Sequence, residues 1–152
     1  MTRVVAVDLD GALCDTRPLW RAWLEAARPL LGFDPEELPE DRGEAAADLD
    51  RRGAGNWRAL LARWAEERAP VYLRRDAETS AALRALEASG SEVGVFTDAP
   101  EQLARVALAQ LGADRRIAAL ATGASALDRL LGTLGGGAAV VGTRAELLDL
   151  EP

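Results

Sequence analysis

The chain has 152 residues, 49% of them hydrophobic and 28% charged, and these proportions are typical of one globular domain. The net charge of −7 argues against nucleic-acid backbones and anionic membranes as partners. The sequence contains no histidine and no lysine, which excludes Ser-His and Cys-His catalytic pairs, histidine metal sites and Schiff-base lysines. The single cysteine, Cys14, excludes an internal disulfide.

The first predicted element is a strand over "RVVAVD" (3–8). It is a short, continuous, valine-rich run, as expected of a buried central strand in a parallel sheet. No apolar run reaches the roughly 18 residues that a membrane-spanning helix needs. The chain opens directly on this strand instead of an apolar signal sequence, so we expect a cytoplasmic protein.

Residues 17–72 interrupt the strand pattern and predict a small α-helical cap inserted after strand one. Two helical stretches, "RPLWRAWLEAARPLL" and "NWRALLARWAEERA", are divided by the Pro-, Gly- and acid-rich segment "GFDPEELPEDRG". All four tryptophans lie in this region. We interpret them as the core of the cap, with the alternative that one or two of them line a pocket.

Beyond residue 73, helices that end in glycine alternate with hydrophobic strands expected at 91–97, 113–122 and 138–143. This alternation predicts an α/β fold, a three-layer, Rossmann-like parallel sheet of about four strands. The core domain would comprise residues 1–16 and 73–152. Functional sites in such sheets form at the carboxyl ends of the strands.

The most informative stretch is "DLDGALCDT" (8–16), which crowds Asp8 and Asp10 at the end of the first strand. It resembles motif I of the haloacid dehalogenase superfamily, whose usual form is D-x-D-G-[TV]-L-x-D. "VGVFTDAP" resembles the second motif of that superfamily, a hydrophobic strand that ends in Thr or Ser. The helical insertion between them resembles the cap of one of its branches, and the second aspartate is typical of its phosphatases.

The resemblance implies a Mg²⁺-dependent phosphatase that acts on a small phosphorylated metabolite. Asp8 would be the nucleophile that forms an aspartyl-phosphate, and Asp10 would be the general acid and base. Both would bind Mg²⁺, Asp10 with its backbone carbonyl also on the metal, because a divalent cation offsets the repulsion between the two carboxylates. Thr97 would hold a phosphate oxygen. A loop of capping and turn carboxylates is the structural alternative for the pair.

Two elements of the family pattern are absent. Ala124 or Ser125 stands where a lysine or arginine is expected, and Thr143 stands where the family has a metal-binding aspartate. Thr143 and Glu146 instead form the S/T-x-x-E pattern of a helix capping box. We predict that Arg144 supplies the missing cation to the phosphate, with a surface arginine in the last helix as the alternative.

Asp98 follows Thr97, where many relatives have asparagine, and we place it at the phosphate site, with the alternative that it caps the helix that begins near Glu101. Two functions follow from these residues. The first is a Mg²⁺-dependent phosphatase with a weakened or rebuilt catalytic site. The second is a catalytically inactive protein of the same fold that binds or regulates.

Overall fold

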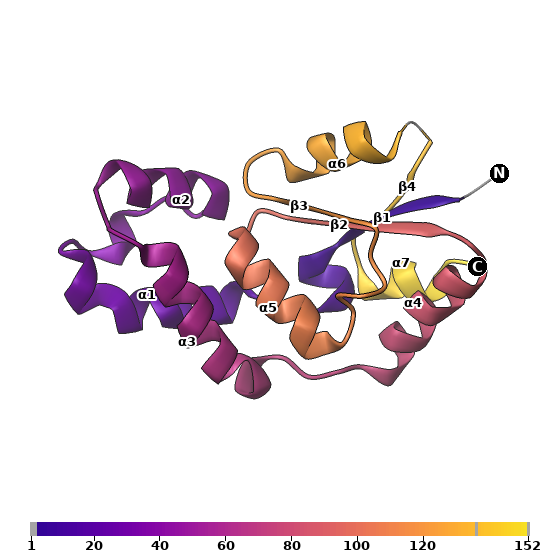
Figure 1. The fold of residues 1–152 in the computed structure, drawn as a ribbon, viewed down its shortest axis with the longest axis horizontal. Coiled ribbons are helices and arrows are strands. Elements are labelled where there is room, and N and C mark those ends of the chain that lie inside the picture. The colour runs from indigo at the N-terminus through magenta and orange to yellow at the C-terminus, as the bar shows by residue number, and fades with distance from the viewer. Residues whose placement is uncertain (1–2, 136, 152) are drawn as a thin grey trace.

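The computed structural model describes residues 3–135 and 137–151 and shows a four-stranded, all-parallel sheet with the order β3-β2-β1-β4 (Figure 1). This confirms the predicted α/β class and strand number. The strands are β1 (Val4–Asp8), β2 (Glu92–Thr97), β3 (Ala119–Thr122) and β4 (Ala139–Val141). The helices are α1 (Arg17–Leu31), α2 (Arg42–Arg51), α3 (Trp57–Tyr72), α4 (Ala77–Ala88), α5 (Glu101–Leu111), α6 (Ala126–Leu134) and α7 (Arg144–Asp149), with helical turns η1 (Leu9–Leu13) and η2 (Pro35–Glu37).

The sheet is the middle of three layers. Helix α6 covers one face, where Ala6 of β1 packs against Leu130. Helices α4, α5 and α7 cover the other face, where Val5 and Val7 of β1 join the larger core (Figure 1). Side chains alternate between the faces of a strand, so one valine-rich strand supplies both cores.

Residues 17–72 are largely helical, as predicted, and their helices α1, α2 and α3 lie beyond the carboxyl ends of the strands (Figure 1). The rings of Trp20, Trp23 and Trp57 pack within 5.5–6.4 Å of one another, between centroids. They belong to the same buried cluster as the valines of β1, so the helical region and one face of the sheet share a continuous core. The division into a core and a cap domain at residues 17–72 stays a prediction.

Two elements differ from their predicted bounds. Strand β3 begins at Ala119, and the residues expected to open it, 113–118, lie outside the sheet, with a turn at 114–116. Helix α2 was not predicted, because the proline and glycine residues of the segment before it masked its start. Asp41 caps α2 by accepting a hydrogen bond from the backbone N–H of Glu44 at 2.9 Å.

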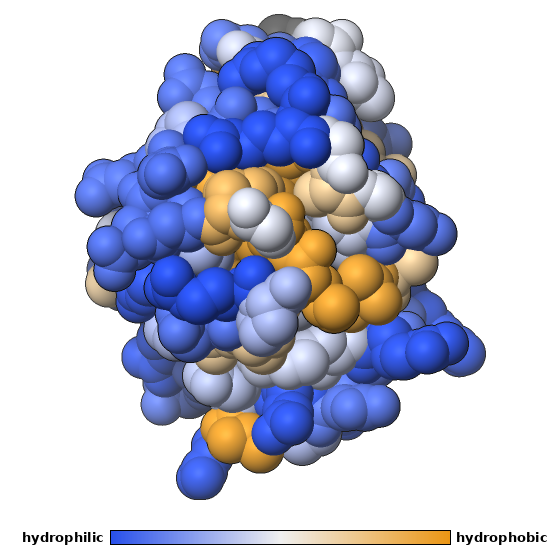
Figure 2. Space-filling view, turned by 90° about the vertical axis from the view of Figure 1, so that its left-hand side faces the viewer, coloured by the Kyte–Doolittle hydropathy of each residue, from blue (hydrophilic) through white to orange (hydrophobic). Residues whose placement is uncertain are grey.

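The end of the molecule that α1, α2 and α3 form carries an apolar area surrounded by polar residues (Figure 2). Leu30 of α1 and Leu60 of α3 are exposed and line a shallow hollow of about 200 Å³. Within the described ranges, no helix has the length and apolar character required to cross a membrane.

Candidate active site

The carboxyl ends of β1 and β2 meet at a pocket of about 810 Å³. Asp8 is the last residue of β1, and Thr97 is the last residue of β2. The two strands are parallel, and Asp8 lies opposite Phe96, so the two ends lie side by side. Asp8, Asp10, Thr97 and Asp98 all line this pocket. The structure therefore brings together four of the five residues predicted for the site.

The turn η1 carries Asp10 back over the end of β1. Asp8 stabilises this turn, since its carboxylate accepts a hydrogen bond from the backbone N–H of Asp10 at 3.1 Å. Gly11 has a φ of 121°, and a Cβ there would lie 2.6 Å from the carbonyl oxygen of Gly142. Only glycine fits this conformation and this close approach, so the glycine of "DLDG" is required to place Asp10.

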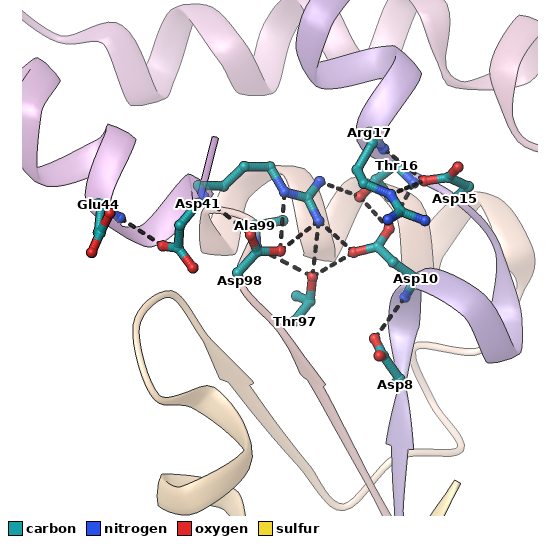
Figure 3. A network of polar contacts seen from close by, with 11 residues as sticks. Asp8, Asp10, Asp15, Thr16, Arg17, Asp41, Glu44, Thr97, Asp98 and Ala99 are labelled. Carbon is teal, nitrogen blue, oxygen red and sulfur yellow. Dashed lines mark hydrogen bonds and ion pairs between the residues drawn. The ribbon is translucent and has the colours of Figure 1, made fainter. Parts of the chain in front are cut away.

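Both carboxylate oxygens of Asp10 are fully hydrogen-bonded (Figure 3). Oδ1 accepts from the backbone N–H of Thr16 at 2.7 Å and from its hydroxyl at 2.6 Å. Oδ2 accepts from the hydroxyl of Thr97 at 2.7 Å and from Nη2 of Arg42 at 2.5 Å. The side chain of Asp10 is only 8% exposed, so it lies in a polar cluster largely shielded from water.

Arg42, the first residue of α2, is the cation of this cluster, and its side chain is 2% exposed. Besides Asp10, its guanidinium donates to Asp98 Oδ1 from Nε at 3.1 Å and from Nη2 at 2.8 Å, and to the Thr16 hydroxyl from Nη1 at 2.7 Å. The backbone N–H of Arg42 donates to Asp98 Oδ2 at 3.0 Å. Asp98 thus binds both the side chain and the N-terminus of α2, and it does not cap α5, which begins after Pro100 without a side-chain hydrogen bond.

The two aspartates of the motif differ in acidity. Burial alone would raise the pKa of Asp10, but the Arg42 charge and the hydrogen bonds from Thr16 and Thr97 outweigh it, and the pKa is lowered. Burial raises the pKa of Asp8 from 3.8 to about 6, and the hydrogen bond from the Asp10 N–H offsets only part of that shift. Burial also raises the pKa of the Cys14 thiol to about 12, so this cysteine is a thiol at neutral pH and a poor nucleophile.

Three solved structures resemble this chain in fold. A candidate beta-phosphoglucomutase from Thermotoga maritima aligns with 93% of this chain and 75% of its own, at a TM-score of 0.55 and 17% identity. CbbY from Rhodobacter sphaeroides, solved in complex with phosphate, aligns with 82% of this chain and 65% of its own, at 0.59 and 16%. A HAD phosphatase from Thermococcus onnurineus aligns with 93% of this chain and 77% of its own, at a TM-score of 0.55 and 22% identity. The chain has the haloacid dehalogenase (HAD) fold.

Sequence comparison adds nothing to this structural likeness. No family model matches the chain, and no curated protein sequence matches it. This chain spans about two thirds of the CbbY chain and about three quarters of the other two. At 16–22% identity the likeness establishes the fold, and the chemistry has to be argued from the residues present.

Arg144 lies apart from the other predicted site residues. Its guanidinium pairs with Asp76 at 2.6 Å and with Glu78 at 3.3 Å, both at the start of α4, and its side chain is 47% exposed. This is the surface position that we gave as its alternative, so the predicted phosphate contact gains no support from the structure. The cation at the strand ends is Arg42, which the sequence analysis missed. The spacing Asp41-x-x-Glu44, a capping pattern, could have revealed the start of α2, but not the partner of its first residue.

The exits of β3 and β4 carry structural side chains. Ser125 precedes α6 with a φ of 55° and makes no capping hydrogen bond. Arg129 donates to the backbone carbonyls of Thr122 and Ala124, and so it closes the loop after β3. Thr143 accepts the N–H of Glu146 at 3.1 Å, as the predicted capping box requires. In the described part of the chain, these exits supply neither the cation nor the metal-binding carboxylate of the HAD pattern.

The residues present keep only part of the magnesium site that the HAD pattern implies. Across residues 3–135 and 137–151, no group of three or more His, Cys, Asp or Glu side chains could hold a metal. Both oxygens of Asp10 are occupied by hydrogen-bond donors, Thr143 replaces a carboxylate, and Asp8 is left as a single carboxylate ligand. Mg²⁺ is held by one or two carboxylates, with waters and substrate phosphate oxygens completing its octahedron, so Asp8 and the backbone carbonyl of Asp10 are the protein groups left that would hold it.

Proposed function

We propose that the chain is a HAD-type hydrolase that acts on a small phosphorylated molecule, with Asp8 as the nucleophile. The observation that supports this most directly is the position of Asp8. It ends β1 in the pocket, and among the described residues its carboxylate accepts a hydrogen bond only from the backbone N–H of Asp10, whereas its neighbours Asp10 and Asp98 are both paired with Arg42.

The chemistry of Asp8 suits this role. With a pKa of about 6, its carboxylate is mostly ionised at neutral pH, and it is less stabilised by hydrogen bonds than that of Asp10. An Oδ atom of Asp8 would attack phosphorus, and the bond from phosphorus to the leaving oxygen would break, which gives an aspartyl-phosphate that water hydrolyses. CbbY, one of the similar structures, was solved in complex with phosphate, which supports a phosphate ligand in this fold.

The remaining predicted roles are part of the proposal. Thr97 is buried, and its hydroxyl lies between the ends of β1 and β2, where a phosphate oxygen would be held. The carboxylate of Asp98 serves Arg42, so a phosphate contact for Asp98 stays a prediction. Dependence on Mg²⁺ also stays a prediction.

A second candidate function is a HAD-fold protein that binds a ligand without turnover. The observation that favours it is the loss of reactive groups at two of the four strand exits. Ser125 and Thr143 stand where the HAD pattern has a cation and a carboxylate, and Thr143 caps a helix.

The deciding experiment is phosphate release from a panel of small phosphate compounds, with and without Mg²⁺, by the wild type and by Asp8→Asn. We expect release by the wild type and none above background by Asp8→Asn. Asp114→Asn is the matched control, because it removes an exposed carboxylate far from the strand ends and should leave release unchanged. Equal release by wild type and Asp8→Asn would refute the proposal, and no release from any compound would favour the second candidate.

A further inference from the structure

The large hydrophobic side chains that stay exposed gather on two helices. Five such residues occur in the described part of the chain, and four of them, Leu30, Leu60, Val71 and Tyr72, belong to α1 and α3. Leu30 and Leu60 line the apolar hollow of about 200 Å³ at the end of the molecule that Figure 2 shows. An apolar area that is gathered in one place and surrounded by polar residues is typical of a surface that another protein covers.

Helix α3 buries one side and exposes another. The buried side consists of Trp57, Leu61, Ala65 and Ala69. The exposed side carries Leu60, Arg63, Trp64, Glu67 and Val71, which we call the α3 stripe, and of these only Trp64 is half-buried. Counted from Leu60, the positions 64, 67 and 71 follow at steps of four, three and four residues. This is the spacing of the seam along which two helices pack against each other.

The α3 stripe is complementary to a reversed copy of itself. Along the helix its side chains are apolar, positive, aromatic, negative and apolar in turn, and Arg63 and Glu67 both border the hollow. When a second copy is rotated by half a turn, Leu60 of each chain lies opposite Val71 of the other, and Arg63 of each lies beside Glu67 of the other. A twofold interface requires this kind of self-complementarity. Two parallel α3 helices would instead place Arg63 beside Arg63, and these like charges repel.

We propose that this chain forms a twofold dimer with a second copy of itself through the α3 stripe, with the two α3 helices antiparallel. The inference does not depend on the proposed function. None of the stripe residues lines the pocket at the strand ends, so the dimer and the candidate active site use different residues. Helix α3 has 16 residues and is about 24 Å long. The contact is therefore small, and we expect a dissociation constant of about 1–100 μM.

The first test is the mass of the wild type in solution, measured by sedimentation equilibrium from about 1 to 300 μM chain. We expect the average mass to rise from that of one chain toward that of two chains across this range. Leu60→Asp places a carboxylate opposite Val71 of the second copy. Because burying this charge is costly, the substitution should raise the dissociation constant by about 10-fold or more.

Charge reversal tests the antiparallel arrangement. Arg63→Glu brings like charges together at two places in the dimer, so it should raise the dissociation constant by about 10-fold or more, and Glu67→Arg should do the same. In an equimolar mixture of these two variants, a mixed dimer has opposite charges at both places, so the mixture should associate as the wild type does. Arg84→Glu is the matched control, because it makes the same charge change at an exposed position of α4, beside the sheet, and it should leave association unchanged (Figure 1).

The substituted side chains are exposed, so each variant should keep the circular dichroism spectrum of the wild type. A wild type that stays a single chain across the whole range would overturn the inference, and the α3 stripe would then be a surface for a different protein. A dimer that Leu60→Asp and Arg63→Glu leave unchanged would also overturn it, because the contact would lie on another face. A mixture that associates no better than either charge variant alone would overturn the antiparallel arrangement.

Discussion

The carboxyl ends of β1 and β2 differ from those of β3 and β4 in what their polar side chains do. At the first pair, Asp8, Asp10, Thr97 and Asp98 converge on one pocket. At the second pair, the polar side chains close loops or cap helices, as Thr143 does for α7. The difference shows that two strand exits of a HAD fold can keep the geometry of a site while the other two keep only the fold.

The buried cation near the strand ends comes from the helical region. A HAD phosphatase is expected to place a lysine or arginine at the exit of β3, where this chain has Ala124 and Ser125. Here a buried arginine comes from α2, which packs against that same exit through Gly43. The helical region thus contributes a positive charge to the ends of β1 and β2. Arg42 pairs there with Asp10 and Asp98, so the contrast with the ends of β3 and β4 can be tested at Arg42.

The largest expected effect is that of Arg42→Met. It removes the positive charge between Asp10 and Asp98, and breaking a buried ion pair by removing one partner costs about 3–5 kcal/mol of stability. Arg144→Met, at an exposed ion pair, should leave the free energy of unfolding unchanged within error. Urea denaturation followed by tryptophan fluorescence measures both. Equal losses of unfolding free energy in the two variants would mean that the buried ion pairs of Arg42 stabilise the fold no more than an exposed pair does.

A smaller effect is expected where α2 contacts the loop after β3. Gly43→Ala should destabilise the fold by about 1–3 kcal/mol, because the added Cβ would collide with the backbone of Ala124. Gly132→Ala in α6 has nothing within 4 Å of its Cβ, so it should stabilise the fold by about 0.5–1 kcal/mol. Thermal unfolding measures both variants, and changes of opposite sign in Tm would confirm the close contact of α2 with the loop after β3. The same sign for both would contradict it.

The sequence predicted the fold well because its signals are local. The valine-rich run at β1, the helix-glycine-strand alternation and the span of α1 all follow from residues close in the chain. Strand β3 was predicted too long because the apolar residues Ile117 and Ala118 lead into it, whereas the charged residues 114–116 before them form a turn. The sheet order and the convergence of Asp8 with Thr97 follow from general rules for parallel sheets.

The site was predicted only in part, because its decisive contact is not local. Arg42 meets Asp10 and Asp98 across separations of 32 and 56 residues, and this requires α2 to dock on the strand ends. No pattern around Arg42 distinguishes it from the many arginines that pair on the surface. Arg144 was favoured for its place in the chain, beside Thr143, but its side chain lies against the start of α4.

Asp8→Asn should stabilise the protein while it removes activity. The pKa of Asp8 is raised from 3.8 to about 6, so the folded state binds more protons than the unfolded state between about pH 4 and 6, and stability falls as pH rises through that window. At pH 7 the variant should gain about 1–2 kcal/mol, after a discount for the partial exposure of the group. The gain should vanish below about pH 4. Unfolding measured from pH 3.5 to 7.5 tests this, and a constant difference across that range would mean that Asp8 is not the titrating group.

The smallest expected effect separates the threonines at two strand ends. Thr143→Ala removes the capping hydrogen bond from the Glu146 N–H, and the loss of a helix cap costs about 1 kcal/mol. Phosphate release should not change, because Thr143 acts on α7 alone. Thr97→Ala should lower phosphate release, since its hydroxyl binds Asp10 and faces the pocket. If Thr143→Ala lowered release as much as Thr97→Ala, the exit of β4 would belong to the site, and the contrast between the two pairs of strand ends would be wrong.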